Sequence, residues 1–190
     1  MHDLASPSGG LLRLRARSLS VRSVAVALGI VFLAIASWIE VPMLPVPMTM
    51  QTFAVTIIGA FYGWRLGALT VLAWLGAAAV GLPVLAGFAG GPAPFMGPTA
   101  GYLASFPLVA ALMGWMAERN WTSGPVVKPF LVMLSGNALC LAIGGAWLAA
   151  LIGPQKALDF GVTPFLLGGV LKSALASGLI KAAARTTHPA

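Results

Sequence analysis

Charged side chains are scarce in this sequence. Only 8% of its 190 residues are Asp, Glu, Lys or Arg, whereas about 25% of residues are charged in a typical soluble domain. Hydrophobic residues make up 59% of the chain, and the mean hydropathy is +0.94. These values exclude an ordinary soluble protein and indicate an integral membrane protein. The pI near 10.6 does not indicate nucleic-acid binding, because most of the 11 Lys and Arg flank apolar segments and orient the chain in the bilayer.

The residues that form reactive sites are also few. The single cysteine, Cys140, lies in an apolar run, so no intramolecular disulfide can form and we interpret it as a small core residue. The two histidines, His2 and His188, lie in the two tails. The acidic residues are Asp3, Glu40, Glu118 and Asp159. The sequence therefore contains no metal-ligand cluster, no nucleophile beside a base and no nucleotide-binding P-loop, so we expect no catalytic site, no bound cofactor and no ATP hydrolysis by this chain.

The apolar residues fall into six segments, which predict an all-α polytopic protein, a bundle of six transmembrane helices. The segments are about 23–39, 50–62, 66–80, 99–117, 128–152 and 162–180. We expect residues 1–22 to form a basic tail, 23–182 the transmembrane domain and 183–190 a second tail. The first segment also has features of a signal peptide, but further apolar segments follow it and the charge pattern favours its retention.

Basic residues indicate the orientation of the chain. With six spans, nine of them lie on the side of the termini and only Lys156 lies on the other side. The nine are Arg13, Arg15, Arg17, Arg22, Arg65, Arg119, Lys128, Lys181 and Arg185. Because short cytoplasmic regions are enriched in Lys and Arg, we expect both termini to be cytoplasmic.

Residues 81–102 carry no charge, yet Gly and Pro interrupt them repeatedly, so they cannot form an ordinary helix. Irregular backbone at membrane depth is tolerated only where protein or a water-filled cavity surrounds it. We therefore interpret this stretch as the lining of a binding cavity. The prolines of residues 42–47 predict an extended outer loop, and residues 153–161 a second loop.

Lys172 is the basic residue that lies within a predicted span. It follows Pro164 by eight residues, about 12 Å along a helix, and a cation at that depth costs several kcal/mol unless it is paired or hydrated. Because no acid lies within the spans, a bound anion is its natural partner, although a structural role stays open. Asn137 lies at a similar depth and could bind a neutral polar head or the backbone of another helix.

Other candidates lie at the outer ends of the segments. Gly97 and Thr99 lie in the turn before the fourth segment, where free N–H groups can bind a ligand and Thr99 can cap the helix. Tyr102 and Phe88 offer flat apolar surfaces, although packing is the alternative. The side chains of Thr49 and Gln51 could reach the same cavity, and capping of the second segment would also explain Thr49.

Ala25 and Gly29 are four residues apart and place small side chains on one face of the first segment. Such a face lets helices approach closely in lipid. We interpret it as a docking face for a partner membrane protein, with packing inside the chain as the alternative.

Several short motifs occur along the chain in one order. They lie at residues 47–52, 75–84, 88–91, 97–103, 136–138 and 164–168, followed by Lys172. Taken together they resemble the biotin-specific substrate-binding (S) components of energy-coupling-factor (ECF) vitamin transporters, the BioY family. The resemblance adds Ala89, Gly90 and Gly91 to the candidate site residues.

The resemblance implies a protein of a prokaryotic cell membrane that captures biotin from outside. It implies a transmembrane coupling protein and two cytoplasmic ATPases as partners, with ATP used by the ATPases and not by this chain. It also implies that the ligand lies under the outer loops and that Lys172 belongs to its site. Biotin joins a carboxylate, an alkyl chain and a ureido head, which a lysine, aromatic surface and amide or backbone donors would suit.

The chain departs from the family pattern beside this lysine. The pattern there reads Gly-Asp-x-x-Lys, whereas this chain has Gly169 in place of the Asp. Trp74 and Leu141 also lie at positions where the family tends to have tyrosines. A different small acid or a biotin precursor is therefore an alternative ligand, and an intramembrane enzyme or an assembly factor is an alternative of another class.

Overall fold

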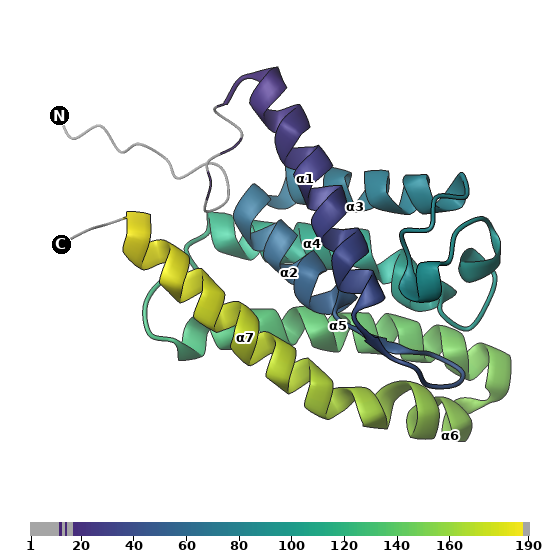
Figure 1. Ribbon diagram of the computed structural model, residues 1–190. Coiled ribbons are helices and arrows are strands. Elements are labelled where there is room, and N and C mark those ends of the chain that lie inside the picture. Colours follow the sequence, from purple (N-terminus) through teal and green to yellow (C-terminus); the bar gives the residue numbers. More distant parts are fainter. Residues whose placement is uncertain (1–11, 13, 15–16, 188–190) are drawn as a thin grey trace, which may run out of the picture.

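The computed structural model describes residues 12, 14 and 17–187 (Figure 1). The described part of the chain folds into α-helices, with one small hairpin after the first helix and one long irregular connection at residues 80–99. The elements are α1 (Leu19–Trp38), β1 (Glu40–Val41), β2 (Met48–Thr49), α2 (Gln51–Tyr62), α3 (Trp64–Ala79), α4 (Ala100–Glu118), α5 (Val127–Ile152), α6 (Pro154–Ala157) and α7 (Thr163–Thr187).

Four helical stretches are long and apolar enough to cross a membrane: Leu19–Trp38, Ala100–Glu118, Val127–Ile152 and the continuous Pro154–Ala184. Two further apolar helices, Gln51–Tyr62 and Trp64–Ala79, are shorter. The helical class expected from the sequence is confirmed, and the chain is a multi-pass membrane protein.

Helix α4 lies at the centre of the bundle and contacts α2, α3 and α5. Glycines make this close packing possible, because an added Cβ at Gly59 would lie 2.4 Å from the carbonyl oxygen of Ala110. At Gly114 an added Cβ would lie 2.3 Å from the backbone nitrogen of Trp64. Backbone therefore meets backbone at both places, and no larger residue fits.

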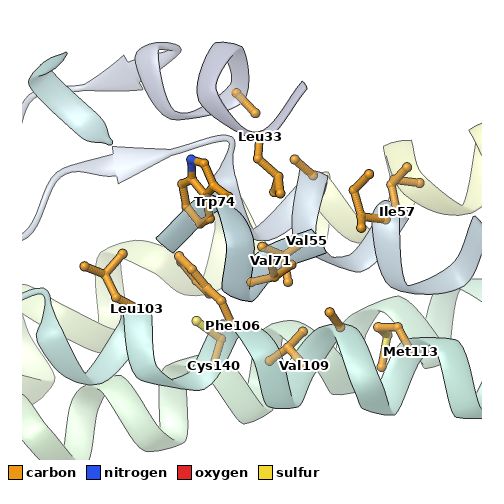
Figure 2. Close-up of a cluster of buried hydrophobic side chains, with 14 of the residues drawn as sticks. Leu33, Val55, Ile57, Val71, Trp74, Leu103, Phe106, Val109, Met113 and Cys140 are labelled. Carbon is orange, nitrogen blue, oxygen red and sulfur yellow. The ribbon is translucent and has the colours of Figure 1, made fainter. Parts of the chain in front are cut away.

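The apolar core lies among α2, α3, α4 and α5, and α1 and α7 add side chains such as Leu33 and Ile180 (Figure 2). Its largest side chain, Trp74, is fully buried and stacks on Phe106 with ring centroids 6.0 Å apart. Val71, Val109 and Met113 continue the cluster along α3 and α4. The Trp74 indole N–H donates to the carbonyl of Val84, which fixes the chain that follows α3 to this core.

The connections gather at two ends of the bundle (Figure 1). The hairpin, the irregular residues 80–99 and α6 lie at one end, on the right in Figure 1, and the α2–α3 and α4–α5 turns lie at the other. We call residues 80–99 the roof loop. As the sequence predicted, this loop is not an ordinary helix: it contains two short 3-10 turns, Ala86–Phe88 and Ala93–Phe95, and its Gly81, Gly87 and Gly91 have positive φ.

Two connections differ from the sequence prediction. Residues 153–161 were expected to form a loop, but α6 and a π-helical stretch, Leu158–Val162, lead directly into α7. Gly153, with φ of 89°, ends α5, and Pro154 then occupies the first position of a new helix. A backbone N–H has no partner within the helix at that position, so its absence in proline costs no hydrogen bond. The first connection is paired rather than simply extended, because Glu40 pairs with Thr49 and Val41 with Met48.

The predicted docking face of α1 is also corrected. Gly29 is buried, and an added Cβ would lie 2.6 Å from Thr70 and 3.1 Å from Tyr62. The carbonyl of Ala25 accepts a 2.8 Å hydrogen bond from the Tyr62 hydroxyl. The Ala25 and Gly29 face therefore packs against α2 and α3 of the same chain, and small residues serve intrachain packing there.

Candidate functional site

A cavity of about 250 Å³ lies beneath the roof loop. Its walls come from the hairpin, α2, the roof loop, α4, α5 and α7, so segments distant in sequence meet around it. The lining is mostly apolar, with a few polar groups, as is usual for small-molecule sites.

Three helices each turn one face to this cavity. Helix α4 and the residue before it contribute Thr99, Tyr102, Leu103 and Phe106; α5 contributes Asn137, Cys140 and Leu141; α7 contributes Phe165, Gly169 and Lys172. Within each set the later residues follow the first one by three, four or seven positions, which is the spacing of one helix face.

Lys172 is 9% exposed and reaches the cavity from the middle of α7. Its Nζ donates a 3.2 Å hydrogen bond to the Thr52 hydroxyl on α2. An ammonium group has three donors, and no Asp or Glu of the described residues lines the cavity. The site therefore presents a positive charge that the described lining does not neutralise.

Asn137 has a fixed orientation. Its Nδ2 donates to the carbonyl of Met133 and to the Ser173 hydroxyl, both at 3.1 Å. Ser173 in turn donates to the carbonyl of Gly169 at 2.7 Å. Both amide donors of Asn137 thus bond within the protein, so this side chain offers a ligand its oxygen rather than its N–H groups.

Thr49 and Gln51 form a polar corner where the hairpin meets α2. The Thr49 hydroxyl donates to Gln51 Oε1 at 3.1 Å and accepts from the Gln51 backbone N–H at 3.2 Å. It thus satisfies a first-turn donor, although Met50 and not Thr49 is the N-cap residue of α2. Gln51 Nε2 donates to Ser37 Oγ on α1 at 3.1 Å. Both residues are buried and line the cavity.

Tyr102, Thr99 and Ala89 also line the cavity. The Tyr102 hydroxyl donates to the carbonyl of Gly161 at 2.7 Å, so its single donor is already used within the protein. That ring lies nearly parallel to Phe165, with centroids 6.3 Å apart and an interplanar angle of 28°. Thr99 precedes α4 as predicted, but its hydroxyl donates to the carbonyl of Pro94 and does not cap the helix.

Four predicted site residues do not line the cavity: Phe88, Gly90, Gly91 and Gly97. Phe88 is 63% exposed and stacks on Trp38 at 5.0 Å. An added Cβ at Gly90 would lie 2.4 Å from the carbonyl of Leu82, and the Gly91 N–H donates to the carbonyl of Ala78. The carbonyl of Gly97 accepts from the Trp147 indole. These residues shape the roof loop and attach it to the helices.

The sequence interpretation also missed residues that line the cavity, including Thr52, Phe106 and Phe165. Cys140, interpreted as a core residue, is fully buried and borders the cavity as well. Helix-face spacing could have identified several, because Cys140 follows Asn137 by three residues and Phe165 precedes Lys172 by seven.

The arrangement suits binding rather than catalysis. It combines one cation, four hydroxyl groups (three threonines and one tyrosine) and two amide side chains with aromatic and aliphatic walls. Within the described part of the chain no group of His, Cys, Asp and Glu could hold a metal ion. A small molecule with an apolar body and one acid group fits this chemistry best.

The sequence matches the BioY family over residues 9–188. It is 36% identical over 151 residues to a protein named "Probable biotin transporter BioY" of Pyrococcus horikoshii, covering 80% of this chain and 88% of that protein. It is 38% identical over 160 residues to "Biotin transporter BioY" of Rhizobium etli, covering 80% and 86%.

A solved structure is also similar to this fold. It is a crystal structure of the S-component for biotin from an ECF-type ABC transporter, with a TM-score of 0.77 and 25% sequence identity over 88% of this chain and 94% of that chain. The relatives are named as transporters and not as enzymes. The chain therefore belongs to the BioY family.

Proposed function

We propose that this chain is the substrate-capture component of a biotin uptake transporter. The observation that carries the proposal is the buried, uncompensated ammonium of Lys172 in an otherwise apolar cavity beneath the roof loop. Burying a cation costs free energy that an anionic ligand offsets on binding. The names of the relatives make biotin, a monocarboxylic acid, the preferred ligand.

The three parts of biotin have counterparts in the cavity. Its carboxylate pairs with Lys172, whose side chain reaches the cavity from α7. Its alkyl chain and fused rings pack on the faces of Tyr102, Phe106 and Phe165. Its ureido head meets the polar corner of Thr49 and Gln51, where hydroxyl and amide groups provide both donors and acceptors.

We also propose six membrane crossings, with both termini cytoplasmic and the cavity facing outward in a prokaryotic cell membrane. The placement of basic residues supports this orientation. Arg65 and Arg119 lie at the α2–α3 and α4–α5 turns, opposite the roof loop, whereas Lys156 lies on α6 at the roof end. Helices α2 and α3 are shorter than about 20 residues, and the roof loop and hairpin supply the remaining depth at the outer end.

Because its structural neighbour is the S-component for biotin of an ECF-type ABC transporter, this chain would pass its ligand to a transmembrane coupling protein driven by two cytoplasmic ATPases. Because the sequence contains no P-loop, the ATPases and not this chain would use the ATP. Affinity purification of the tagged chain from its own cells, in mild detergent, should recover these partners. Recovery of the chain alone, with no ATPase in the eluate, would contradict this part of the proposal.

Binding of radiolabelled biotin to the purified chain in detergent tests the ligand directly. We expect saturable binding with one site per chain, which excess unlabelled biotin removes and an unrelated monocarboxylic acid does not. Binding that fails to saturate, or that other small acids displace equally well, would contradict biotin as the ligand.

A further inference from the structure

Three exposed tryptophans lie where the start of α3 meets the end of α4. The exposed fractions of Trp64, Trp115 and Trp121 are 37%, 37% and 48%. The Trp64 backbone N–H donates a 3.2 Å hydrogen bond to Glu118 Oε1, and a Cβ added at Gly114 would lie 2.3 Å from the Trp64 nitrogen. The rings of Trp115 and Trp121 meet edge to face, with centroids 5.8 Å apart. The two helix ends therefore bring the three indoles to one region of the surface.

Two arginines accompany these rings. The guanidinium carbon of Arg65 lies 4.8 Å from the ring centroid of Trp64, and that of Arg119 lies 4.1 Å from the ring centroid of Trp115. An indole face attracts a cation, but this contact uses none of the five N–H donors of a guanidinium in a conventional hydrogen bond. Among the described residues, neither guanidinium has a hydrogen-bond or ion-pair partner. We call Trp64, Arg65, Trp115, Arg119 and Trp121 the Trp–Arg patch.

The turn after α4 explains part of this arrangement. Asn120 has a φ of 59°, and its N–H donates to the carbonyl of Ala117 at 3.0 Å. The Trp121 N–H donates to the carbonyl of Met116 at 3.1 Å. These two bonds form a Schellman motif, in which the residue after the turn often contacts the last turn of the helix. The motif accounts for the contact of Trp121 with Trp115. It does not account for a cation over Trp115 or for the exposure of both rings.

The patch lies at the depth of the lipid headgroups. Helix α4 is a candidate membrane span of 19 residues, about 28 Å long, which is close to the roughly 30 Å of the hydrocarbon core. Arg119 directly follows its last residue. Arg65 is the second residue of α3, and the bond from Trp64 to Glu118 holds the start of α3 level with the end of α4. Both arginines therefore lie near the membrane surface, at the end of the bundle opposite the roof loop (Figure 1).

Exposed apolar surface continues from the patch into the membrane. On α3, Leu69 and Leu72 follow Arg65 by four and seven residues and are 52% and 53% exposed. On α4, Leu108 precedes Trp115 by seven residues and is 57% exposed. Residues at these spacings share one helix face. A molecule bound at the patch can therefore extend along exposed leucines into the hydrocarbon core.

We propose that the Trp–Arg patch binds an anionic phospholipid, whose phosphate accepts hydrogen bonds from Arg65 and Arg119 and whose acyl chain lies along the exposed leucines of α3. A guanidinium suits phosphate because its planar set of donors matches the phosphate oxygens. Two guanidinium groups outweigh the single carboxylate of Glu118, which accepts the Trp64 N–H. An acidic protein segment would match the charge as well, but the headgroup depth and the apolar surface below the patch favour a lipid.

Native mass spectrometry of the purified chain in a neutral detergent, titrated with phosphatidylglycerol, measures the affinity for the first bound lipid. Arg65→Gln and Arg119→Gln each remove one charge of the patch, and the double variant removes both. Lys156→Gln is the matched control, because it removes one charge from an exposed lysine at the roof end. Phosphatidylcholine, which has no net charge, tests whether headgroup charge matters, and inorganic phosphate tests whether a free anion is the ligand.

We expect each single substitution in the patch to weaken phosphatidylglycerol binding about fivefold, and the double substitution to weaken it at least about tenfold. Lys156→Gln should change this affinity less than about twofold, because its charge lies at the far end of the bundle. Phosphatidylcholine should bind all variants equally, and inorganic phosphate should not displace the lipid. A double variant within about twofold of wild type, an equal loss in Lys156→Gln or with phosphatidylcholine, or displacement by inorganic phosphate would overturn the inference.

Biotin binding and partner recovery separate this inference from the proposed function. The patch lies away from the cavity, so the double variant should bind biotin as the wild type does, which also shows that it is folded. A wild-type chain that does not bind biotin would refute the proposed function and leave this inference standing. A double variant that keeps its lipid affinity but no longer recovers the ATPases would assign the patch to a protein partner and overturn lipid binding. Should the double variant fail to fold, Arg119→Gln alone decides the outcome, because Arg119 is exposed.

Discussion

Replacing Lys172 with methionine removes the positive charge from the cavity while keeping an unbranched side chain of similar length. Lys172 is 9% exposed, so solvent screens its interaction with a ligand only weakly. Removing one partner of a buried, hydrogen-bonded charge pair costs about 2 to 5 kcal/mol. Because about 1.4 kcal/mol is tenfold in affinity, Lys172→Met should weaken biotin binding by about 30-fold or more.

The same substitution should not destabilise the ligand-free protein. Lys172 donates a hydrogen bond to the neutral hydroxyl of Thr52, which also lines the cavity. Removing the lysine therefore leaves no buried carboxylate unpaired. Replacing a buried charge with an apolar side chain is often neutral or stabilising. Affinity and stability should therefore change in different ways: biotin binding falls, while the unfolding temperature stays equal or rises.

Calorimetric titration of the purified variant with biotin and with its carboxamide measures the effect. We expect the wild-type chain to prefer biotin, and Lys172→Met to bind the two ligands about equally. Lys128→Met, at an exposed lysine near the start of α5, is the matched control and should keep the wild-type preference. A Lys172→Met variant that binds biotin within about threefold of wild type, under 1 kcal/mol, would refute the pairing of Lys172 with the ligand.

Three further substitutions test the structure around the cavity. Trp38→Ala removes the 3.1 Å hydrogen bond from the indole N–H to the carbonyl of Pro83 and the stacking on Phe88. The roof loop should then open more often, and labelled biotin should dissociate faster in a chase experiment. Tyr102→Phe removes the hydroxyl that donates to the carbonyl of Gly161, and it should lower the free energy of unfolding by about 1 to 3 kcal/mol. Biotin affinity should change little, because the aromatic ring stays. Gly114→Val places atoms against the backbone of Trp64, so we expect aggregation on size-exclusion chromatography, whereas a monodisperse peak would contradict the close α3–α4 contact.

Much of the architecture could be predicted from local signals in the sequence. Uncharged apolar runs have a direct physical meaning, and the segments at 50–62 and 128–152 agree closely with α2 and α5. Repeated Gly and Pro excluded a regular helix over residues 81–102, and most of this stretch forms the irregular roof loop. Lys172 was recognisable because a cation inside a span is costly and needs a partner.

The errors arose where a local signal had two meanings. Gly153 and Pro154 were interpreted as loop residues, but the same pair ends one helix and starts the next. The small residues Ala25 and Gly29 permit close packing without showing whether the neighbour is the same chain or another one. Only the tertiary structure shows that this neighbour is α2 and α3.

The roof loop illustrates the same limit for the site. Phe88, Gly90, Gly91 and Gly97 were assigned to the cavity because they lie in a stretch that shapes it. They define the path of the loop, while its Leu85, Ala86, Ala89 and Pro94 line the cavity. Which side of an irregular loop faces inward depends on contacts such as Trp38 with Phe88 and Trp147 with Gly97, and no periodicity in the sequence encodes them.

The central claim is that Lys172 binds the acid group of the ligand, and a distance measurement tests it most directly. Solid-state NMR on the chain in lipid, with ¹³C in the biotin carboxyl and ¹⁵N in the lysine side chains, reports the separation of these two nuclei. We expect a strong dipolar coupling, corresponding to about 4 Å or less, that disappears in Lys172→Met and persists in Lys128→Met. Bound biotin with no such coupling in the wild-type protein would place its carboxylate elsewhere and contradict the account.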